Sequence, residues 1–510
     1  MGLQESVSVS MSSAPKTVSA QNLGIQLIIG PSVMCGGRTV SVPVANGTDP
    51  AANAINYLGA TGNTLTSGTN TVEYAKAKAA FSQGTSPNGA PSIIKLGAMG
   101  GAASATATIV DNAGGFTGGS IAAIVNGVTV PINWGTSKDS TMTALAAAMQ
   151  FVLRAQTAGD STSTVAYTSG THTILITPKT GVSVFVAFII SATGTGDTLA
   201  ISSIVYSATE AYADALARII ISDSNFYQLT IASVVAADIL AVSNAVNAAT
   251  QPLFFFYKSS DVNILNLTPA ADAALTTSGT IAAQILSTKA KRTAAFFNGL
   301  GQHQDSNLAG YIAGFQPGMF NVAYTQPDGS MTPDNLTQTQ HNNAAGYYGL
   351  VNGLDAFTSG KAVNTLETVA GFNILRWGTC QDGTSWIDAV IFQDYIVGAL
   401  QAAVYGVLVN NPKVPYDING KAMILAAMES VFKPLVSLPG VSRPISAYAE
   451  DVNGNQIGGY VITFPSFTDP NSPFGYVSTN DRLNRVLNNL KWECFYTGAI
   501  NSIHMTGTIA

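Results

Sequence analysis

The residues able to do acid–base or nucleophilic chemistry are few and scattered. The four histidines are His172, His303, His341 and His504, and only His303 has an acidic residue close by, Asp305. An aspartate at this spacing can orient an imidazole, but no serine or cysteine nucleophile motif accompanies the pair. We therefore expect His303 to lie in a solvated loop, and we predict no catalytic residues and no enzyme.

Motifs for metals and phosphates are also missing from the sequence. No H-x-x-x-H, HExxH or GxxxxGK[ST] pattern occurs. The three cysteines, Cys35, Cys380 and Cys494, form no CxxC pair, and their odd number argues against a disulfide framework. Residues 451–455 resemble the start of a calcium loop, but Ile462 stands where the bidentate glutamate belongs. We predict a turn there, no metal site and no cofactor.

Two carboxylates, Asp388 and Asp394, lie on a long predicted helix. Their six-residue separation places them on different sides of that helix, so they do not form an acid pair in a cleft. One suits the first turn, where a carboxylate meets the positive end of the helix, and the other suits a polar contact with a neighbouring element.

The stretch that positions these carboxylates has a clear order of elements. A strand at 372–377 precedes a helix that Ser385 is expected to cap, and apolar residues recur along this helix at three- and four-residue spacing. Asn410-Asn411 should end the helix. Pro412 to Pro415 predict a stiff extended connector, and Asn419-Gly420 should lead into a second helix.

The middle of the chain alternates between helical and strand patterns. A strand at 23–30 and a helix at 71–83 come first, and residues 316–370 look loop-rich. The patterns after residue 200 predict helix 209–221, strand 226–231, helix 236–249, strand 253–257, helix 281–286, strand 293–297 and helix 306–315. Such alternation favours a partly parallel sheet covered by helices.

Residues 101–199 differ in composition, because they are rich in Gly, Thr, Ser and Ala. Asn126-Gly127 predicts a tight hairpin, and Asp139 and Ser140 begin a helical pattern. Strand patterns follow at 165–168, 171–177 and 182–190. We read this segment as a self-contained α+β insertion.

Both ends of the chain have strand periodicity without a sequential partner. Near the start, Val7, Val9 and Met11 alternate with serines; near the end, Ile503, Met505 and Ile509 alternate with His504 and threonines. A lone strand must find backbone partners in some sheet, in its own chain or in a neighbour. These six apolar residues are our candidate inter-subunit contacts.

The bulk composition excludes some classes of function. Only 10% of residues are charged, against ~25% in ordinary globular proteins. Such a surface suits a subunit packed against copies of itself, or a secreted or thermally robust globular protein. The net charge of −6, without a Lys/Arg run, argues against direct nucleic-acid binding. We expect no signal peptide and no membrane insertion, since the longest apolar run, 182–190, is too short to span a bilayer.

Several segments resemble the contractile-tail sheath proteins of bacteriophages, in order and spacing. The matching segments are Glu73 to Gln83 (EYAKAKAAFSQ), Gly371-Phe372-Asn373, Trp386-Ile387-Asp388, Asp394-Tyr395, Lys413 to Gly420 and Gly498 to Ile503. The resemblance implies a sheath subunit that polymerises around a tail tube and contracts, driving the tube through the host envelope. Its implied partners are copies of itself, the tail tube protein, and baseplate and tail terminator proteins. The implied location is the virion tail, after assembly in the host cytoplasm.

Combining the patterns with the resemblance predicts a multidomain α/β and α+β fold with mixed, helix-covered sheets. The expected parts are an N-terminal arm (1–20), a discontinuous middle domain (21–100 and 200–365), an outer insertion (101–199), a C-terminal core domain facing the tube (366–495) and a C-terminal strand arm (496–510). The alternative is a tail-borne or surface adhesin, a carbohydrate-binding module or a carbohydrate-active enzyme, which the Gly/Thr/Asn richness would also suit.

Overall fold

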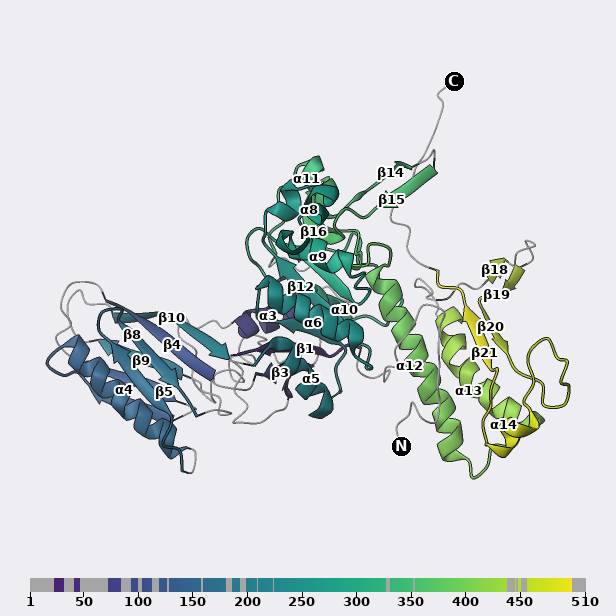
Figure 1. The fold of residues 1–510 in the computed structure, drawn as a ribbon, viewed down its shortest axis with the longest axis horizontal. Helices are drawn as coiled ribbons and strands as arrows, with labels where there is room; N and C mark the ends of the chain where they lie inside the picture. Colours follow the sequence, from purple (N-terminus) through teal and green to yellow (C-terminus); the bar gives the residue numbers. More distant parts are fainter. Residues whose placement is uncertain are drawn as a thin grey trace, which may run out of the picture.

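The computed structural model describes most of the chain between residues 23 and 497. The described ranges are 23–31, 41–45, 72–83, 93–99, 103–111, 119–125, 128–156, 159–179, 186–192, 199–208, 210–222, 224–326, 331–351, 354–437, 445, 448–450 and 456–497. Figure 1 shows a central helix-covered sheet, with a Gly/Thr-rich insertion on one side and a C-terminal lobe on the other. This multidomain α/β and α+β architecture, with mixed sheets, is the fold class predicted above.

The central sheet has eight strands among the described residues. In their order across the sheet they are β17 (Phe372–Arg376), β16 (Val363–Val369), β13 (Thr293–Phe297), β12 (Phe254–Ser259), β11 (Gln228–Ile231), β1 (Gln26–Gly30), β3 (Ile93–Ala98) and β2 (Ser41–Ala45). All neighbouring pairs are parallel except β17 with β16 and β2 with β3. The sheet is therefore mixed only at its two ends.

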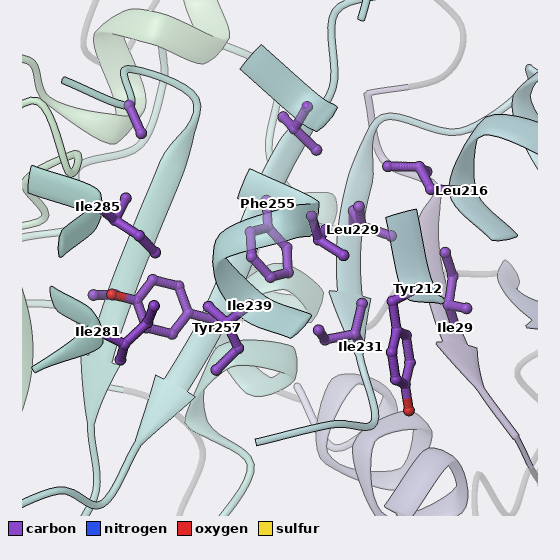
Figure 2. Packing of buried hydrophobic residues seen from close by; sticks show 14 of the residues in the cluster. Ile29, Tyr212, Leu216, Leu229, Ile231, Ile239, Phe255, Tyr257, Ile281 and Ile285 are labelled. Atoms are coloured by element: carbon purple, nitrogen blue, oxygen red, sulfur yellow. The ribbon is translucent and has the colours of Figure 1, made fainter. Parts of the chain in front are cut away.

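Helices cover both faces of this sheet, which is why the inner strands β1, β11 and β13 are buried at every position. Along β12, Phe254 and Phe256 point to one face and Phe255 and Tyr257 to the other, and all four are buried. The second face packs on α5 (Tyr212–Ser222), α6 (Ala236–Ala248) and α9 (Ile281–Ser287), as Figure 2 shows. The first face packs on α10 (Gln304–Ala313) and the start of α12 (Ile387–Asn410).

Helix α10 also packs against α3 (Val72–Phe81), and this contact corrects one expectation. A Cβ on Gly310 would lie 2.2 Å from the backbone oxygen of Ala80, so only glycine allows the two helices to approach this closely. Asp305 is buried here and forms an ion pair with Lys76. The solvated loop expected around His303 and Asp305 is therefore wrong, because Asp305 lies inside a helix that is covered on both sides.

Among its described residues, the insertion consists of two antiparallel sheets and one helix that packs one side against them. Its elements are β4 (Ala103–Asp111), β5 (Gly119–Val125), β6 (Val128–Asn133), α4 (Lys138–Ala155), β7 (Thr164–Thr168), β8 (Thr173–Thr177), β9 (Val186–Ala192) and β10 (Leu199–Ala208). The sheet orders are β10-β4-β8-β7 and β6-β5-β9. The predicted hairpin is β5–β6, and Ser137 caps α4 through a capping box with Ser140. Strand β10 belongs to the first of these sheets, so the insertion's sheet extends to Ala208.

Residues 316–370, expected to be loop-rich, contain four regular elements. They are α11 (Gln338–Ala344), β14 (Tyr347–Val351), β15 (Leu354–Thr358) and β16. The expectation fails because the strand β16 is buried although it carries polar side chains. Asn364 is fully buried there and is held by hydrogen bonds to the backbones of Ala295, Gly378 and Thr379.

Among its described residues, the C-terminal lobe consists of two helices and short strands. They are α13 (Ile418–Ser437), β18 (Tyr448–Glu450), β19 (Gln456–Gly458), β20 (Tyr460–Thr463), α14 (Thr479–Leu483) and β21 (Lys491–Cys494), and they adjoin the second half of α12. Ser385 does not cap α12, because its Oγ donates to Asp382 and the chain enters the helix through an extended Trp386.

Helix α12 is long and apolar enough to cross a membrane, judged by length and composition. In the structure, 61% of its most apolar window is buried within the protein, as in the core helix of many proteins that span no membrane. Its apolar character is therefore accounted for by the two cores that it joins.

Candidate functional site: an open strand edge in the C-terminal lobe

The C-terminal lobe contains a sheet of only two strands among the described residues, β20 and β21. They are antiparallel, with Tyr460 opposite Cys494 and Ile462 opposite Trp492. The Phe495 N–H donates to the Gly459 carbonyl at 2.9 Å. Since hydrogen-bonded and non-hydrogen-bonded pairs alternate along an antiparallel ladder, the backbone N–H and C=O groups of Tyr460 and Ile462 point outward from β20.

One face of this small sheet packs against α13, and aromatic rings make the contact. The ring of the fully buried Phe432 stacks on Tyr460, with centroids 4.7 Å apart, and lies 5.7 Å from the ring of Trp492. Burial in this face raises the pKa of the Cys494 thiol to about 11. The side chains of Tyr460, Ile462, Trp492 and Cys494 are nevertheless only half-buried, because two strands do not cover the helix completely.

The two outer edges of the sheet differ. Beside β21, Ile445 forms an antiparallel bridge with Tyr496, so one end of that edge is occupied by the chain itself. Beside β20, no strand of the described residues pairs with the outward groups of Tyr460 and Ile462. A row of outward backbone donors and acceptors is a template for an added strand.

The connector from α12 and the first turn of α13 position the helix beneath the sheet. The connector from Pro412 to Pro415 separates α12 from α13, and the Asp417 side chain accepts the backbone N–H groups of Asn419 and Gly420 in the first turn. A Cβ at Gly420 would lie 1.9 Å from the Pro415 carbonyl oxygen, so the turn requires glycine. The buried stripe of α13 consists of Ile424, Met428, Phe432 and Leu435.

A buried polar cluster fixes α12 to the central sheet. Arg292, immediately before β13, donates to both Asp394 oxygens at 3.0 and 2.5 Å, and the Tyr227 hydroxyl donates to the same carboxylate at 2.9 Å. Burial alone would lower the pKa of Arg292, but the adjoining carboxylate raises it instead. Burial, reinforced by Asp394, raises the pKa of Tyr227. Asp394 is therefore the polar contact expected of it, made within its own chain.

Asp388, in the first turn of α12, contacts the end of the described chain. The Tyr496 hydroxyl donates to Asp388 Oδ2 at 2.6 Å, and the Tyr496 ring stacks on Phe392 with centroids 4.9 Å apart. Burial raises the pKa of Asp388, against the opposing effect of the Tyr496 hydrogen bond. The first residue of the predicted C-terminal arm is thus fastened to α12.

The six residues predicted as inter-subunit contacts lie outside the described residues. They are Val7, Val9, Met11, Ile503, Met505 and Ile509. The predicted arm begins at residue 496, and its first two residues, Tyr496 and Thr497, are described and lie beside the small sheet. The structure therefore shows where this arm leaves the lobe, next to the strand β21.

The residues considered for catalysis do not come together. His303 begins α10, where burial lowers its pKa to about 3, and Asp305 pairs with Lys76 rather than with the imidazole. His341 instead contacts Glu367, with Nδ1 and Oε1 2.6 Å apart. Within the described part of the chain, no group of three His, Cys, Asp or Glu side chains could hold a metal ion. The turn expected at 451–455 lies outside the described residues.

The residue types at 460–464 and 491–496 favour strands, but the sequence does not indicate the open edge, because nothing in these two segments shows that they pair. The alternation in β20 and β21 was the available signal, since Val461, Lys491 and Glu493 are exposed while the residues between them face α13.

Comparisons with known proteins add little. No family model and no curated protein matches the chain. Among solved structures, the chain is similar to one chain in the cryo-EM structure of the anti-feeding prophage (AFP) baseplate, 6-fold symmetrised. The two share 12% identity over 61% of this chain and 76% of the other, with a TM-score of 0.38. Similarity at this level does not establish a common fold or function.

Proposed function

We propose that this protein is a structural subunit of a contractile phage tail sheath, and that copies of it polymerise by adding a strand to the β20 edge. The observation that carries the proposal is this edge, where Tyr460 and Ile462 turn their backbone groups away from β21. The strand added is one of the alternating apolar terminal segments of a neighbouring copy. The tail tube, baseplate and terminator proteins would be the other partners.

The energetics suit assembly rather than tight binding of a single partner. Each backbone hydrogen bond on the edge contributes about 0.5–1.5 kcal/mol net, and ordering a terminal segment costs part of that gain. A single added strand would therefore bind weakly. Repeated around a ring or helix, the same contact becomes intramolecular in effect, so the assembled lattice would be stable while monomers stay soluble.

An added strand would also complete the lobe's core. The inward side chains of β20 and β21 are only half-buried over α13. A third strand placed beside β20 would cover more of this face with apolar side chains, at about 25 cal/mol per Å2 of apolar surface removed from water. The contact thus combines backbone pairing with core completion, and it uses neither an enzyme activity nor a cofactor.

The resemblance in sequence supplies the finer part of the proposal. The segments that resemble sheath proteins include the start of α12 and the connector to α13, and these two helices carry the open sheet. On this reading the C-terminal lobe faces the tube and the insertion lies outside. Contraction would draw its free energy from better packing between subunits.

The experiment is assembly of the purified full-length chain, observed by negative-stain microscopy and sedimentation. We expect long tubes from the full chain, and folded monomers from variants lacking residues 1–20 or 503–510. Point variants test the strand contact without shortening the chain. Serine replaces each of Val7, Val9 and Met11 in one variant, and alanine replaces each of Ser6, Ser8 and Ser10 in the matched control.

The serine variant should lose assembly and the alanine control should keep it, because only one face of an added strand contacts the lobe. Circular dichroism checks that every variant remains folded. Normal tubes from the truncated chains would show that the terminal segments are not the added strands.

A further inference from the structure

The insertion has a feature that strand addition does not use, a shallow groove of about 560 Å3 on its outer side. One wall is the exposed side of α4, with Asp139, Thr143, Ala144 and Ala147, and the other is the end of β7, with Tyr167. The opposite side of α4 faces the insertion's core. The groove therefore lies on the surface of a unit with its own hydrophobic core.

The polar groups of the groove are held in place by a chain of hydrogen bonds. The Tyr167 hydroxyl donates to Asp139 Oδ1 at 2.7 Å and lies 3.1 Å from His172 Nδ1. Since an ionised carboxylate only accepts, the phenol proton points to Asp139, and the phenol oxygen accepts from His172 Nδ1–H. These two hydrogen bonds hold the Tyr167 ring and the Asp139 carboxylate in place without a ligand.

The hydrogen-bonded polar groups of the groove mainly offer acceptors, because Ser140 also uses its proton on the Ser137 carbonyl, while the Ser169 hydroxyl can donate or accept. Asp139 is exposed, so its second oxygen can accept from a ligand, and Thr143 uses its own proton on the Asp139 carbonyl, at 2.7 Å. The matching ligand carries several hydroxyl donors.

The charge around the groove favours a neutral ligand. Asp139 would repel an anion, and no Lys or Arg of the described residues lines the groove. The same carboxylate lies in the first turn of α4, where the positive end of the helix offsets its charge, so it attracts a cation only weakly.

An apolar strip runs from the groove along the same side of α4. Ala144 and Ala147 line the groove, and Phe151 follows one turn later with 76% of its surface exposed. Residues four apart lie on one side of a helix, and the distance from Asp139 to Phe151 is about 18 Å at 1.5 Å per residue. An exposed aromatic ring in line with hydroxyl-binding groups suits the flat C–H face of a pyranose.

We propose that this groove binds a neutral oligosaccharide. The sugar hydroxyls would contact Asp139, Thr143 and Tyr167, while the C–H faces of successive rings would pack on the alanines and on Phe151. The proposal is independent of the strand-addition proposal, because the groove shares no residue with the C-terminal lobe or the terminal segments.

The test uses the full-length protein and three neutral linear hexasaccharides: maltohexaose, cellohexaose and fully N-acetylated chitohexaose. Saturation-transfer NMR detects binding, and titration calorimetry measures affinity. We expect at least one of them to bind. Tyr167→Phe should weaken that binding about tenfold, because it removes one hydrogen bond and keeps the ring. Phe151→Ala should weaken it severalfold.

Leu175→Ala is the matched control, since Leu175 is exposed on β8 but does not line the groove. Its affinity should equal that of the unaltered protein, and all three variants should still form tubes. Absence of binding by every hexasaccharide would overturn the proposal. So would equal affinity in Tyr167→Phe and Phe151→Ala, or a preference for heparin or choline over the neutral sugars.

Discussion

The central sheet and the small sheet of the C-terminal lobe, β20 with β21, are completed in different ways. The strand β12 in the central sheet has a parallel neighbour on each side and helices over both faces, and its first five residues are buried. The strand β20 has one described neighbour and one covered face. The contrast teaches that the described chain completes one sheet by itself, whereas the other keeps an edge to which, in our proposal, a second chain adds a strand.

We expect the largest effect on assembly from a proline on the open edge of β20. Ile462→Pro removes a backbone N–H that points outward, so the β20–β21 pairing is kept and an added strand loses a partner. We expect complete loss of tubes in negative stain from a monomer that remains folded. Ile462→Ala shortens the side chain but keeps the N–H, and it should still assemble.

A proline at the neighbouring residue, Val461, should have the opposite effects. The Val461 N–H points toward Glu493, so Val461→Pro breaks the ladder within the lobe. It should lower the thermal midpoint, which Ile462→Pro should leave nearly unchanged. Tubes formed by Ile462→Pro would place the added strand at some other edge.

A second prediction compares a buried ion pair on the central side of α12 with a surface pair on α13. Asp394→Ala leaves Arg292 buried without its partner, so we expect a loss of about 3–5 kcal/mol in the free energy of unfolding, measured by urea denaturation. The double variant Asp394→Leu/Arg292→Met should recover most of that loss. Glu429→Gln breaks the exposed pair with Lys433 and should change nothing measurable. An equally small effect of Asp394→Ala would mean that the buried pair does not anchor α12.

A third and smaller effect depends on pH. Burial in the central domain lowers the pKa of Lys258 from its ordinary value of 10.5 to about 8. Between these two values the unfolded chain still holds the proton that the folded chain has released, so this residue makes stability rise with pH. Lys258→Met should remove that rise. In denaturation curves, the free energy of unfolding of the unaltered protein relative to the variant should therefore be higher at pH 10 than at pH 8. If the difference in the free energy of unfolding between the two proteins did not change with pH, the lowered pKa of Lys258 would be contradicted.

The parts of the fold that could be predicted are those where a local pattern and burial agree. The run from Leu253 to Tyr257 was read as a strand because a strand buried on both faces is apolar at every position, and β13 was predicted residue for residue at 293–297. Asn126-Gly127 likewise predicted the β5–β6 hairpin, since both segments beside it are rich in strand formers.

The failures have physical causes that sequence patterns do not show. The strand β16 contains Asn364, Thr365 and Glu367, which look solvent-facing but are buried and hydrogen-bonded by residues distant in sequence. Strand β4 was missed because its alternating Ala, Ser and Thr carry little hydrophobic contrast. The cap at Ser385 was wrong because Asp382, three residues earlier, takes its hydroxyl.

The candidate site was predictable only in outline. The alternating terminal residues indicated strands in need of a partner, and these residues lie outside the described structure. The acceptor edge could not be predicted, because it depends on which side of β20 the strand β21 occupies, a long-range choice. The contacts of the Phe432 ring with Tyr460 and Trp492 likewise join residues that are distant in sequence, so no local pattern indicates them.

Helix α12 has one more consequence. Its first turns, with Ile387, Val390 and Ile391, form part of the core over the central sheet, while Ile396, Val397 and Leu400 belong to the core around α13. An N-terminal fragment that ends before this helix would lack part of the core over the central sheet. A C-terminal fragment that begins after it would lack part of the core around α13. We therefore expect the two parts of the protein that α12 joins to unfold as a single cooperative unit.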